Sequence, residues 1–427
     1  MRKKQIVCFF LGCLLESAFS LAIAQNVGDL PASPEYKGEI RRGPDGKLTV
    51  QSPEHEAVVQ GVEQREPRIL VVGEGEKVST ISDAARLARD GDVVEIRSGE
   101  YRGQPAVWTQ NKLTIRGTGK RPVMLADGRN AEGKAIWVIR GGDIRIENIE
   151  FRGARVPVGN GAGIRFERGH LTVDRCAFFD NEMGILTANF PELALDVLNS
   201  EFGAAPQHAG QLHHLLYVGS IGRFSVRGSR FEQGYLGHLL KSRARENDVR
   251  YNFLVDGEGG RASYELEFPN GGLAYVIGNV IEQAAGTDNP VLVSYGAEGP
   301  RWQDNALYFA HNTMVNDFHA GTFLKIWNEK FPDGIEAWVI NNLTVGDGDL
   351  FRPAQGRFEG NMTAQRRDLL VYGGIPSRPN NGSPLRGAVR IPGAARGVDL
   401  LPDAEFMFPA GVHPIRRGNA ITPGAFQ

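Results

Sequence analysis

The chain has 427 residues, of which 41% are hydrophobic, 23% are charged and 54 are glycine. This composition is typical of a folded, turn-rich protein and excludes a disordered chain. The formal net charge of −2 excludes the basic excess of nucleic-acid-binding proteins. The length fits two or three average domains, or one repetitive all-β architecture that runs through the whole chain.

The first 24 residues predict a secretory signal peptide. Three basic residues at positions 2–4 precede an apolar run at 6–15, and the small-residue pattern Ala22-Ile23-Ala24 predicts cleavage after Ala24. A membrane anchor is the alternative, but the run is short for a span of about 20 residues. We therefore expect a periplasmic or secreted protein without stable membrane insertion.

Residues 25–67 predict a polar leader, because they are rich in Pro, Glu, Gln and Gly and contain one short strand-like segment at 47–50. Loss of residues 1–24 would leave Cys176 as the one cysteine of the mature chain. An intrachain disulfide is then excluded, so stability must come from packing.

Regular structure is expected from residue 68 onward. Residues 79–91 predict a short amphipathic helix, with Ser79 or Thr80 as its N-cap and Gly91 as its terminator. The segment 92–101, DVVEIRSGEY, then predicts a strand.

A repeat follows. Nine segments align without internal gaps, and their last residues are 23 to 33 positions apart. Three positions before the last residue, all nine carry an apolar side chain: Ile115, Ile146, Val173, Val197, Val226, Val249, Val276, Phe309 and Val339. Two positions after it, seven are again apolar: Phe151, Phe178, Phe202, Phe231, Leu254, Ile281 and Met314. Such self-similarity predicts stacked units that share one core.

The last aligned residue becomes asparagine in the final four segments, at Asn252, Asn279, Asn312 and Asn342. Asparagine side chains stacked at a bend can hydrogen-bond along the stack. Each repeat also holds a second strand, such as HLLYVG, HLLKSR, YELEF and VLVSY. Short strands without intervening helices predict an all-β fold, a right-handed parallel β-helix (solenoid) with a short N-terminal capping helix.

At this point the sequence resembles the pectate-lyase-like β-helix superfamily. The resemblance covers roughly residues 68–345, and the opening segment DAARLARDGDVVEIRSGEYRG resembles the capping helix and first turn of those proteins. We expect the β-helix domain at 68–350. Residues 351–427 are expected to form an irregular C-terminal cap, because the aliphatic columns stop there and an open end would expose a sheet edge. We expect one domain and a monomer.

Strand alternation assigns faces to the second strands. The row predicted to point inward is Leu216, Leu240, Leu266, Leu292 and Leu324. The row predicted to point outward is then Tyr217, Lys241, Glu267, Val293 and Lys325. Residues two positions away on the same strand share this face. They are Glu265 before Glu267, Arg243 after Lys241, Tyr295 after Val293 and Trp327 after Lys325. The adjacent His214 and His238 fall on the inward parity, and His213 on the outward one.

The outward face has the composition of a groove for an acidic polysaccharide, with aromatic faces for sugar rings and cations for uronate carboxylates. β-Elimination needs a base, which Lys241 could supply if Arg243 and partial burial lower its pKa. Arg243 would neutralise the uronate and Tyr217 would protonate the leaving oxygen. The substrate-binding candidates are His213, Glu265, Glu267, Asn270, Tyr295 and Trp327.

GHLLKSRARENDVRYN also resembles the lysine-bearing turn of the chondroitinase-B and alginate-lyase branch, in which a Lys and an Arg act with calcium. The resemblance reaches Lys241. In that branch the acidic calcium ligands precede the lysine, whereas Glu265 and Glu267 follow it here. If calcium takes part, these two glutamates are its expected ligands.

Other interpretations stay open. Lys241 and Arg243 could simply pair with Glu265 and Glu267 as surface charges. The two glutamates, about 6.5–7 Å apart on one strand, could serve an inverting hydrolase, and an epimerase or a non-catalytic polysaccharide-binding module would fit the same groove. His214 and His238 predict a stacked, hydrogen-bonded pair rather than zinc ligands. Cys176 predicts a packed structural residue.

Overall fold

The computed structural model describes residues 39–42, 48–51, 66–208, 212–415, 418 and 420–427, divided into units at residues 1–66 and 67–427. In the first unit, β1 (Glu39–Arg42) pairs antiparallel with β2 (Leu48–Gln51). The expected signal peptide and its cleavage site after Ala24 lie outside the described residues. Among the described residues, no helix has the length and apolar character needed to cross a membrane.

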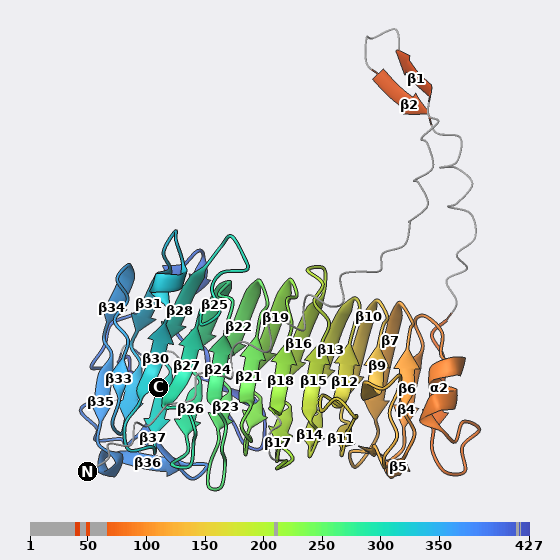
Figure 1. The fold of residues 1–427 in the computed structure, drawn as a ribbon, viewed down its shortest axis with the longest axis horizontal. Coiled ribbons are helices and arrows are strands. Elements are labelled where there is room, and N and C mark those ends of the chain that lie inside the picture. The colour runs from red at the N-terminus through yellow and green to blue at the C-terminus, as the bar shows by residue number, and fades with distance from the viewer. Residues whose placement is uncertain (1–38, 43–47, 52–65, 209–211, 416–417, 419) are drawn as a thin grey trace, which may run out of the picture. The chain divides into compact units, whose positions relative to one another are not determined.

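Residues 67–427 contain a solenoid of three parallel β-sheets (Figure 1). From β4 onward, successive strands fall in sheets 1, 2 and 3 in turn, and each pairs in parallel with its equivalent one turn away. The expected parallel β-helix is therefore confirmed. The sheets continue to Ala364, beyond the boundary expected at residue 350.

Sheet 1 has 12 strands: β3 (Ile69–Val72), β4 (Val93–Ile96), β7 (Lys112–Gly117), β10 (Asp143–Glu147), β13 (His170–Asp174), β16 (Ala194–Leu198), β19 (Arg223–Arg227), β22 (Glu246–Arg250), β25 (Leu273–Ile277), β28 (Ala306–Ala310), β31 (Glu336–Ile340) and β34 (Gly356–Glu359). Sheet 2 has 11: β5 (Glu100–Arg102), β8 (Val123–Leu125), β11 (Glu150–Arg152), β14 (Ala177–Phe179), β17 (Glu201–Gly203), β20 (Arg230–Phe231), β23 (Phe253–Val255), β26 (Val280–Gln283), β29 (Thr313–Asn316), β32 (Leu343–Val345) and β35 (Met362–Ala364). Sheet 3 has 10: β6 (Ala106–Trp108), β9 (Ala135–Ile139), β12 (Ala162–Phe166), β15 (Met183–Thr187), β18 (His214–Val218), β21 (His238–Ser242), β24 (Tyr264–Phe268), β27 (Val291–Tyr295), β30 (Thr322–Ile326) and β33 (Asp349–Leu350).

Both apolar columns of the repeat are confirmed. The Ile115 to Val339 column pairs residue by residue through sheet 1. In sheet 2 the phenylalanine rings of the second column stack inside the solenoid, with ring centres 5.2, 4.7 and 4.6 Å apart from Phe151 to Phe231. Aromatic stacking adds to the burial of these large side chains, so this column holds successive turns in register.

The bend from sheet 1 to sheet 2 carries the expected asparagine ladder. Asn279 Nδ2 donates to Asn312 Oδ1 at 2.9 Å, and Asn279 Oδ1 accepts from the backbone N–H of Asn252 at 2.9 Å. The ladder runs one residue further than the sequence predicts, to Asn361. The residue before each ladder position has a positive φ, such as 68° at Gly278. This left-handed residue turns the chain, and the ladder satisfies the buried backbone groups at the turn.

The N-terminal end of the solenoid is capped by helix α2 (Ile81–Leu87). Its N-cap is Thr80, whose hydroxyl accepts a hydrogen bond from the backbone N–H of Asp83 at 3.1 Å. Ile81, Ala84 and Ala85 are buried against the first turn. The predicted capping helix is confirmed, within the expected 79–91 segment.

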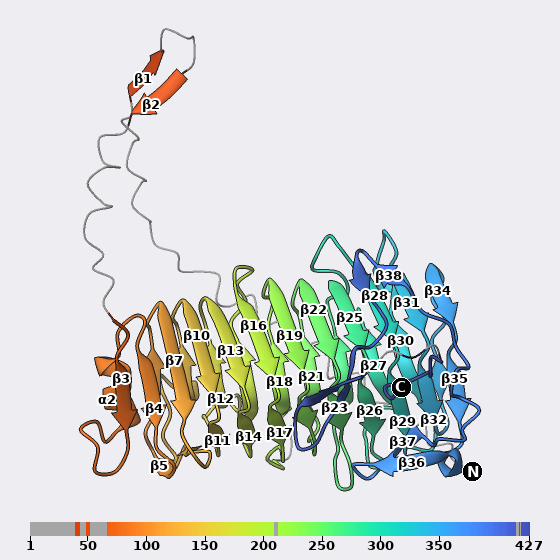
Figure 2. The same cartoon turned by 180° about the vertical axis from the view of Figure 1, so that it is seen from behind.

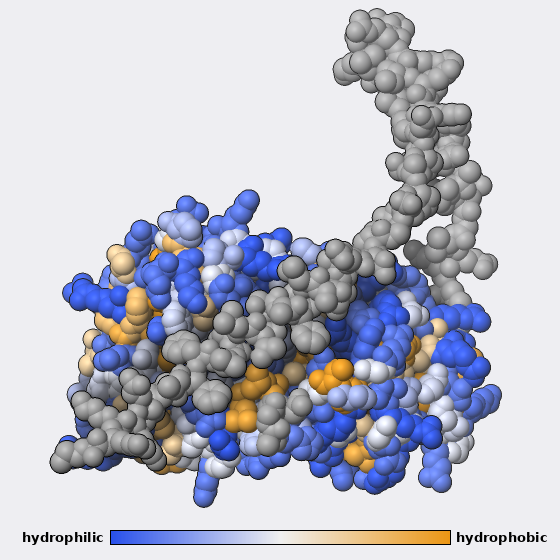
Figure 3. All heavy atoms as spheres, in the orientation of Figure 1, coloured by the Kyte–Doolittle hydropathy of each residue, from blue (hydrophilic) through white to orange (hydrophobic). Residues whose placement is uncertain are grey.

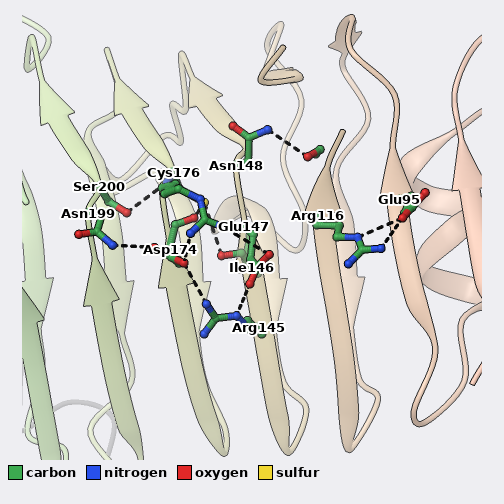
Figure 4. Close-up of polar contacts among 12 residues, drawn as sticks. Glu95, Arg116, Arg145, Ile146, Glu147, Asn148, Asp174, Cys176, Asn199 and Ser200 are labelled. Atoms are coloured by element: carbon green, nitrogen blue, oxygen red, sulfur yellow. Dashed lines mark hydrogen bonds and ion pairs between the residues drawn. The ribbon is translucent and has the colours of Figure 1, made fainter. Parts of the chain in front are cut away.

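The outer face of sheet 1 carries charges that pair with one another (Figure 4). Arg145 donates to Asp174 one strand away at 2.9 Å, and Arg116 donates to Glu95 at 3.1 Å. Cys176 lies in the bend above them, its backbone N–H bonded to Ser200 Oγ at 3.1 Å. Burial raises the pKa of the Cys176 thiol to about 12. Cys176 is thus the packed structural residue that the sequence predicts.

The C-terminal cap covers the outer faces of sheets 1 and 2 in the later turns (Figure 2). Phe406 and Phe426 pack on the Phe253 face of sheet 2, and Leu400 and Ala404 pack beside the tyrosines of sheet 1. These two apolar clusters of described residues include no strand of sheet 3. The cap contains β36 (Leu369–Tyr372), β37 (Ile375–Pro379), β38 (Ala394–Ala395), β39 (Val398–Asp399), β40 (Ala404–Phe406), β41 (Val412–Pro414) and the 3-10 turn η2 (Arg366–Asp368).

Candidate functional site

Sheet 3 turns a corner at the start of its strands, and two consecutive side chains point inward there. Leu239 and Leu240 both belong to the core, and the ladder between β21 and β24 pairs His238 with Tyr264 and Leu240 with Leu266 but skips the residue between. Alternation is therefore broken once, near the start of each strand. His238 and Lys241, three positions apart, lie together on the outer face.

Lys241 lies at the centre of a group of polar side chains on this face, which we call the outer cluster. Its other members are Tyr217, Arg243, Glu267, Glu298, His214 and His238. The Nζ of Lys241 is 3.6 Å from Glu267 Oε2, 3.9 Å from Glu298 Oε1 and 5.4 Å from the centre of the Tyr217 ring. Ladder pairing explains the first of these contacts, because Tyr217, Lys241 and Glu267 occupy one row on neighbouring strands. The outward row that the sequence predicts for these three residues is therefore confirmed.

Arg243 lies beside Lys241 and is held by four groups. Its Nε donates to the Tyr217 hydroxyl at 3.0 Å, and its NH2 donates to Glu298 Oε1 at 2.8 Å. Its NH1 donates to Asn270 Oδ1 and to the second carboxylate oxygen of Glu298. Trp302 Nε1 donates to its backbone carbonyl at 3.0 Å. Burial alone would lower the pKa of Arg243, but the Glu298 and Tyr217 contacts raise it.

Glu298 is the residue of this site that sequence reasoning missed. It lies on the connection between β27 and β28, within the segment SYGAEGPRW that also carries Trp302. Asn270 Nδ2 donates to the carbonyl of Gly299 at 3.3 Å and so ties this loop to the strand that carries Glu267. The side chain of Glu298 is 41% exposed, whereas Arg243 is 14% and Lys241 8% exposed. Glu298 therefore covers the two cations from the solvent side.

His214 and His238 belong to the same outer cluster, which corrects the prediction that they point inward. Their ring centres are 4.6 Å apart with the ring planes tilted by 59°, and the backbone N–H of His238 donates to His214 Nδ1 at 2.9 Å. The predicted hydrogen-bonded pair is therefore confirmed, but its rings are tilted rather than stacked. His238 Nδ1 lies 3.1 Å from Glu267 Oε2, at an angle that makes no hydrogen bond. Burial lowers the pKa of His238 despite the opposing charge of Glu267.

The charges of the cluster also act on Glu267 and His214. Burial would raise the pKa of Glu267, but His238 and Lys241 outweigh it and lower that pKa. Burial, together with the nearby charges of His238 and Lys241, lowers the pKa of His214 well below its ordinary value. Glu267 is therefore ionised and His214 neutral near pH 7, so the cluster combines cations, a carboxylate and a neutral imidazole.

Three predicted substrate contacts are wrong. Tyr295 is fully buried, packs on Phe268 and Phe331, and donates its hydroxyl proton to the carbonyl of Gly272. The predicted register of its strand was one residue out, since the structure pairs Leu266 with Val293 and Glu267 with Ser294. In a strand, a shift of one residue moves every side chain to the other face.

His213 and Glu265 are also buried rather than outward. His213 has no exposed surface, and neither ring nitrogen has a hydrogen-bond partner among the described residues. Glu265 occupies the first inward position at the corner, equivalent to Leu239, and neither of its carboxyl oxygens has such a partner either. Burial, with the nearby acids Asp256 and Glu282, raises the pKa of Glu265 well above its ordinary value.

The glutamate pair does not fit a calcium site. Glu265 points into the solenoid and Glu267 points out, beside Lys241 and His238. The described residues contain no group of three or more acidic, His or Cys side chains placed to hold a metal ion. Two carboxylates on opposite faces of one strand cannot share a cation that needs six to eight oxygen ligands, nor can they act on one bond as an inverting hydrolase pair.

We expect Glu282→Gln to become more stable relative to the wild type as the pH rises. Burial raises the pKa of Glu282 from 4.5 to about 8. A raised folded pKa means that the folded state holds a proton which the unfolded chain releases, so stability is lost between about pH 4.5 and 8. Unfolding by denaturant at pH 5 and pH 8 should show a relative gain of about 3 kcal/mol for Glu282→Gln.

Glutamine keeps the acceptor for the backbone N–H of Gly257, which bonds to Glu282 Oε2 at 2.9 Å. The buried histidines titrate in both proteins and cancel in the difference. The control Glu192→Gln changes an exposed carboxylate and should show no relative change. Equal pH dependence of the wild type and Glu282→Gln would show that Glu282 is ionised in the folded protein.

No family model matches the chain, and no curated protein matches it. Among solved structures, the chain is similar to pectate lyase Pel9A at 11% identity, with 85% of this chain and 97% of that chain covered and a TM-score of 0.49. It is also similar to an alginate lyase from Paenibacillus sp. str. FPU-7, at 12% identity, 69% and 99% coverage and a TM-score of 0.40. It is similar as well to the PL6 family alginate lyase AlyGC, at 14% identity, with 66% of this chain and 52% of that chain covered and a TM-score of 0.33.

Proposed function

We propose that this chain binds an acidic, uronate-containing polysaccharide at the Lys241–Arg243 pair and cleaves it by β-elimination. One observation carries the proposal: the two cations already hold a carboxylate, that of Glu298. Both oxygens of this carboxylate are bonded to the guanidinium of Arg243, the fork geometry with which arginine recognises carboxylates. A sugar carboxylate that displaced Glu298 would meet the same donors.

The outer cluster supplies the groups that elimination requires. Lys241, a cation in the resting cluster, first releases a proton to solvent. The C–H bond beside the uronate carboxylate then breaks and its proton passes to the Lys241 amine, while Arg243 binds the carboxylate on which charge develops. The electron pair forms a C=C bond, and the bond to the glycosidic oxygen breaks. Tyr217, whose hydroxyl accepts a hydrogen bond from Arg243, gives its proton to that oxygen. The products are an unsaturated uronate end and a new hydroxyl end.

We further propose that the protein acts outside the cytoplasm as a monomer. The support is the signal-like sequence of residues 1–24 and a polymeric acidic substrate, which a secreted or periplasmic protein would meet. Residues 25–427, purified from the periplasm or the medium after expression of the full chain, would have Gln25 as their first residue. An unprocessed N-terminus on the exported protein would contradict this part of the proposal.

The test of the proposed function is the ultraviolet absorbance of an unsaturated uronate. Residues 25–427 are incubated with a panel of acidic polysaccharides, with calcium and with a chelator. A rise in absorbance on one member of the panel establishes elimination. New reducing ends without absorbance indicate a hydrolase, and a changed uronate composition at constant chain length indicates an epimerase. Binding without any of these changes indicates a non-catalytic polysaccharide-binding module.

We expect Glu298→Gln to bind acidic oligosaccharides about tenfold more tightly, because it removes a charge that competes with the ligand for Arg243. Titration calorimetry with a uronate oligosaccharide measures the dissociation constant, and KM should fall in parallel. The control Glu74→Gln removes an exposed carboxylate at the far end of the solenoid and should bind as the wild type does. Weaker binding by Glu298→Gln would mean that Glu298 contacts the substrate instead of competing with it.

A further inference from the structure

A second group of cations lies on sheet 3, around Trp327. Lys325 Nζ is 3.7 Å and Lys330 Nζ is 4.9 Å from the centre of the Trp327 ring. The indole N–H donates to Ser294 Oγ at 3.2 Å, and Lys330 donates to the carbonyl of Ala297. Lys330 belongs to the 3-10 turn η1 (Asn328–Lys330), which directly follows Trp327. Two ammonium groups are thus held against one partly exposed aromatic ring.

Neither of these two charges has an acidic partner in the part of the chain that the structure describes. Among the described residues, no carboxylate lies within the 4.0 Å of an ion pair from either ammonium. Lys241, by contrast, has both Glu267 and Glu298 within this distance. Uncompensated like charges that share a site attract an anion, and an aromatic ring beside them offers apolar contact area to a sugar. Outside the grey atoms, the face of the protein drawn in Figure 3 is mostly hydrophilic, with hydrophobic residues in scattered patches.

The position of this group relates it to the outer cluster. Lys241, Glu267, Ser294 and Lys325 pair in one row across four neighbouring strands of sheet 3. Three strand spacings of about 4.8 Å place the Lys325 backbone about 14 Å from that of Lys241. One pyranose unit of an extended polysaccharide is about as long as one strand spacing. A chain that runs along the solenoid therefore reaches Trp327 two or three sugar units beyond Arg243.

We propose that Lys325, Trp327 and Lys330 form a second binding subsite for an anionic sugar unit of the same polysaccharide. The inference rests on the proposed function, because it takes Arg243 as the site of the first unit. The ammonium groups bind the carboxylate of the second unit, and the indole packs against its ring. The subsite makes the protein selective for polymers that carry acidic groups on units two or three apart, over disaccharides and over neutral glycans.

The test compares oligosaccharides of two to six uronate units on the wild type and on Lys325→Gln/Lys330→Gln. For the wild type, the dissociation constant should fall as the length passes three or four units. The variant should bind the dimer as the wild type does and bind the hexamer about tenfold more weakly. The control Lys112→Gln/Lys120→Gln removes the same charge at and beside β7 of sheet 1, from two exposed lysines. It should match the wild type at every length.

The outcomes separate the subsite from the proposed function. A wild type that binds no uronate oligosaccharide of any length overturns the proposed function and the subsite with it. A wild type that binds, with an unchanged length dependence in Lys325→Gln/Lys330→Gln, overturns the subsite alone. Trp327→Phe gives a second measurement. Trp302 lies against Arg243 and reports the dimer and the hexamer alike, so the variant should lose the part of the fluorescence change that the hexamer causes beyond the dimer, and persistence of that part also overturns the subsite.

Discussion

Lys241→Met should lower kcat on the acidic polysaccharide by about 10³-fold, the usual contribution of a general base. Methionine keeps the length and much of the volume of the lysine side chain but cannot accept a proton. Arg243 and its carboxylate contacts remain, so the dissociation constant for the polysaccharide should change by less than about tenfold. Initial rates from the ultraviolet absorbance and titration calorimetry on the same samples give the two quantities.

The comparison with His238→Gln makes the result specific. His238 is another group of the cluster that can accept a proton, because burial lowers the pKa of its imidazole. If Lys241→Met keeps turnover while His238→Gln loses it, the base is His238 and the assignment of Lys241 is wrong. If both lose substrate binding, their role is to hold the cluster together. Circular dichroism on each variant confirms that the solenoid is folded.

The sequence was sufficient to predict sheets 1 and 2. Their columns, from Ile115 to Val339 and from Phe151 to Met314, lie in segments that align without gaps, so one register fits the nine strands of the first column and the seven of the second. Each bend between these sheets turns on a single left-handed residue, such as Asn148 or Gly278. From β10 to β35 this bend keeps one length, so alternation carries through from one strand to the next. The bend from β7 to β8 is longer, and there Met124, not Lys120, pairs with Phe151.

Alternation alone could not show which side chains of sheet 3 point inward and which point outward. At the corner both Leu239 and Leu240 point into the core, whereas strict alternation allows only one of two neighbouring residues to do so. Counting back from Leu240 by alternation therefore placed His238 on the wrong face. At Tyr295 the prediction followed a leucine column through Leu292, whereas the structure continues that column through Val293. Either residue satisfies an apolar column, and the backbone pairing decides between them.

The cations of the site were predictable, but their partner was not. Lys241 and Arg243 lie on a regular strand and its end, where repeat alignment gives their neighbours. Glu298 comes from an irregular loop, and no periodicity fixes where a loop folds. Its place depends on contacts distant in the sequence, such as those of Trp302 with Arg243 and of Asn270 with Gly299.

Asn279→Ala should lower the free energy of unfolding by about 4 kcal/mol, the largest stability effect that we expect from a single side chain outside the apolar core. Asn279 Nδ2 donates to Val249 O and to Asn312 Oδ1, each at 2.9 Å. Its Oδ1 accepts from the backbone N–H and the side-chain amide of Asn252, also at 2.9 Å. Alanine removes all four bonds and leaves a buried backbone N–H unpaired, where water cannot replace the lost acceptor.

The matched control is Ser229→Ala. Ser229 occupies the same position as Asn279 at the bend from sheet 1 to sheet 2, two turns earlier. Ser229 Oγ accepts from the backbone N–H of Ser200 at 3.2 Å and donates to Arg227 O at 3.3 Å, so its loss should cost about 1 kcal/mol. Denaturant unfolding and thermal melting of both variants measure the difference, with the melting temperature of Asn279→Ala roughly 5 °C lower than that of the wild type. Equal destabilisation of the two variants would mean that the asparagine ladder adds nothing beyond a single hydrogen bond, and that packing of the phenylalanine column alone holds the turns together.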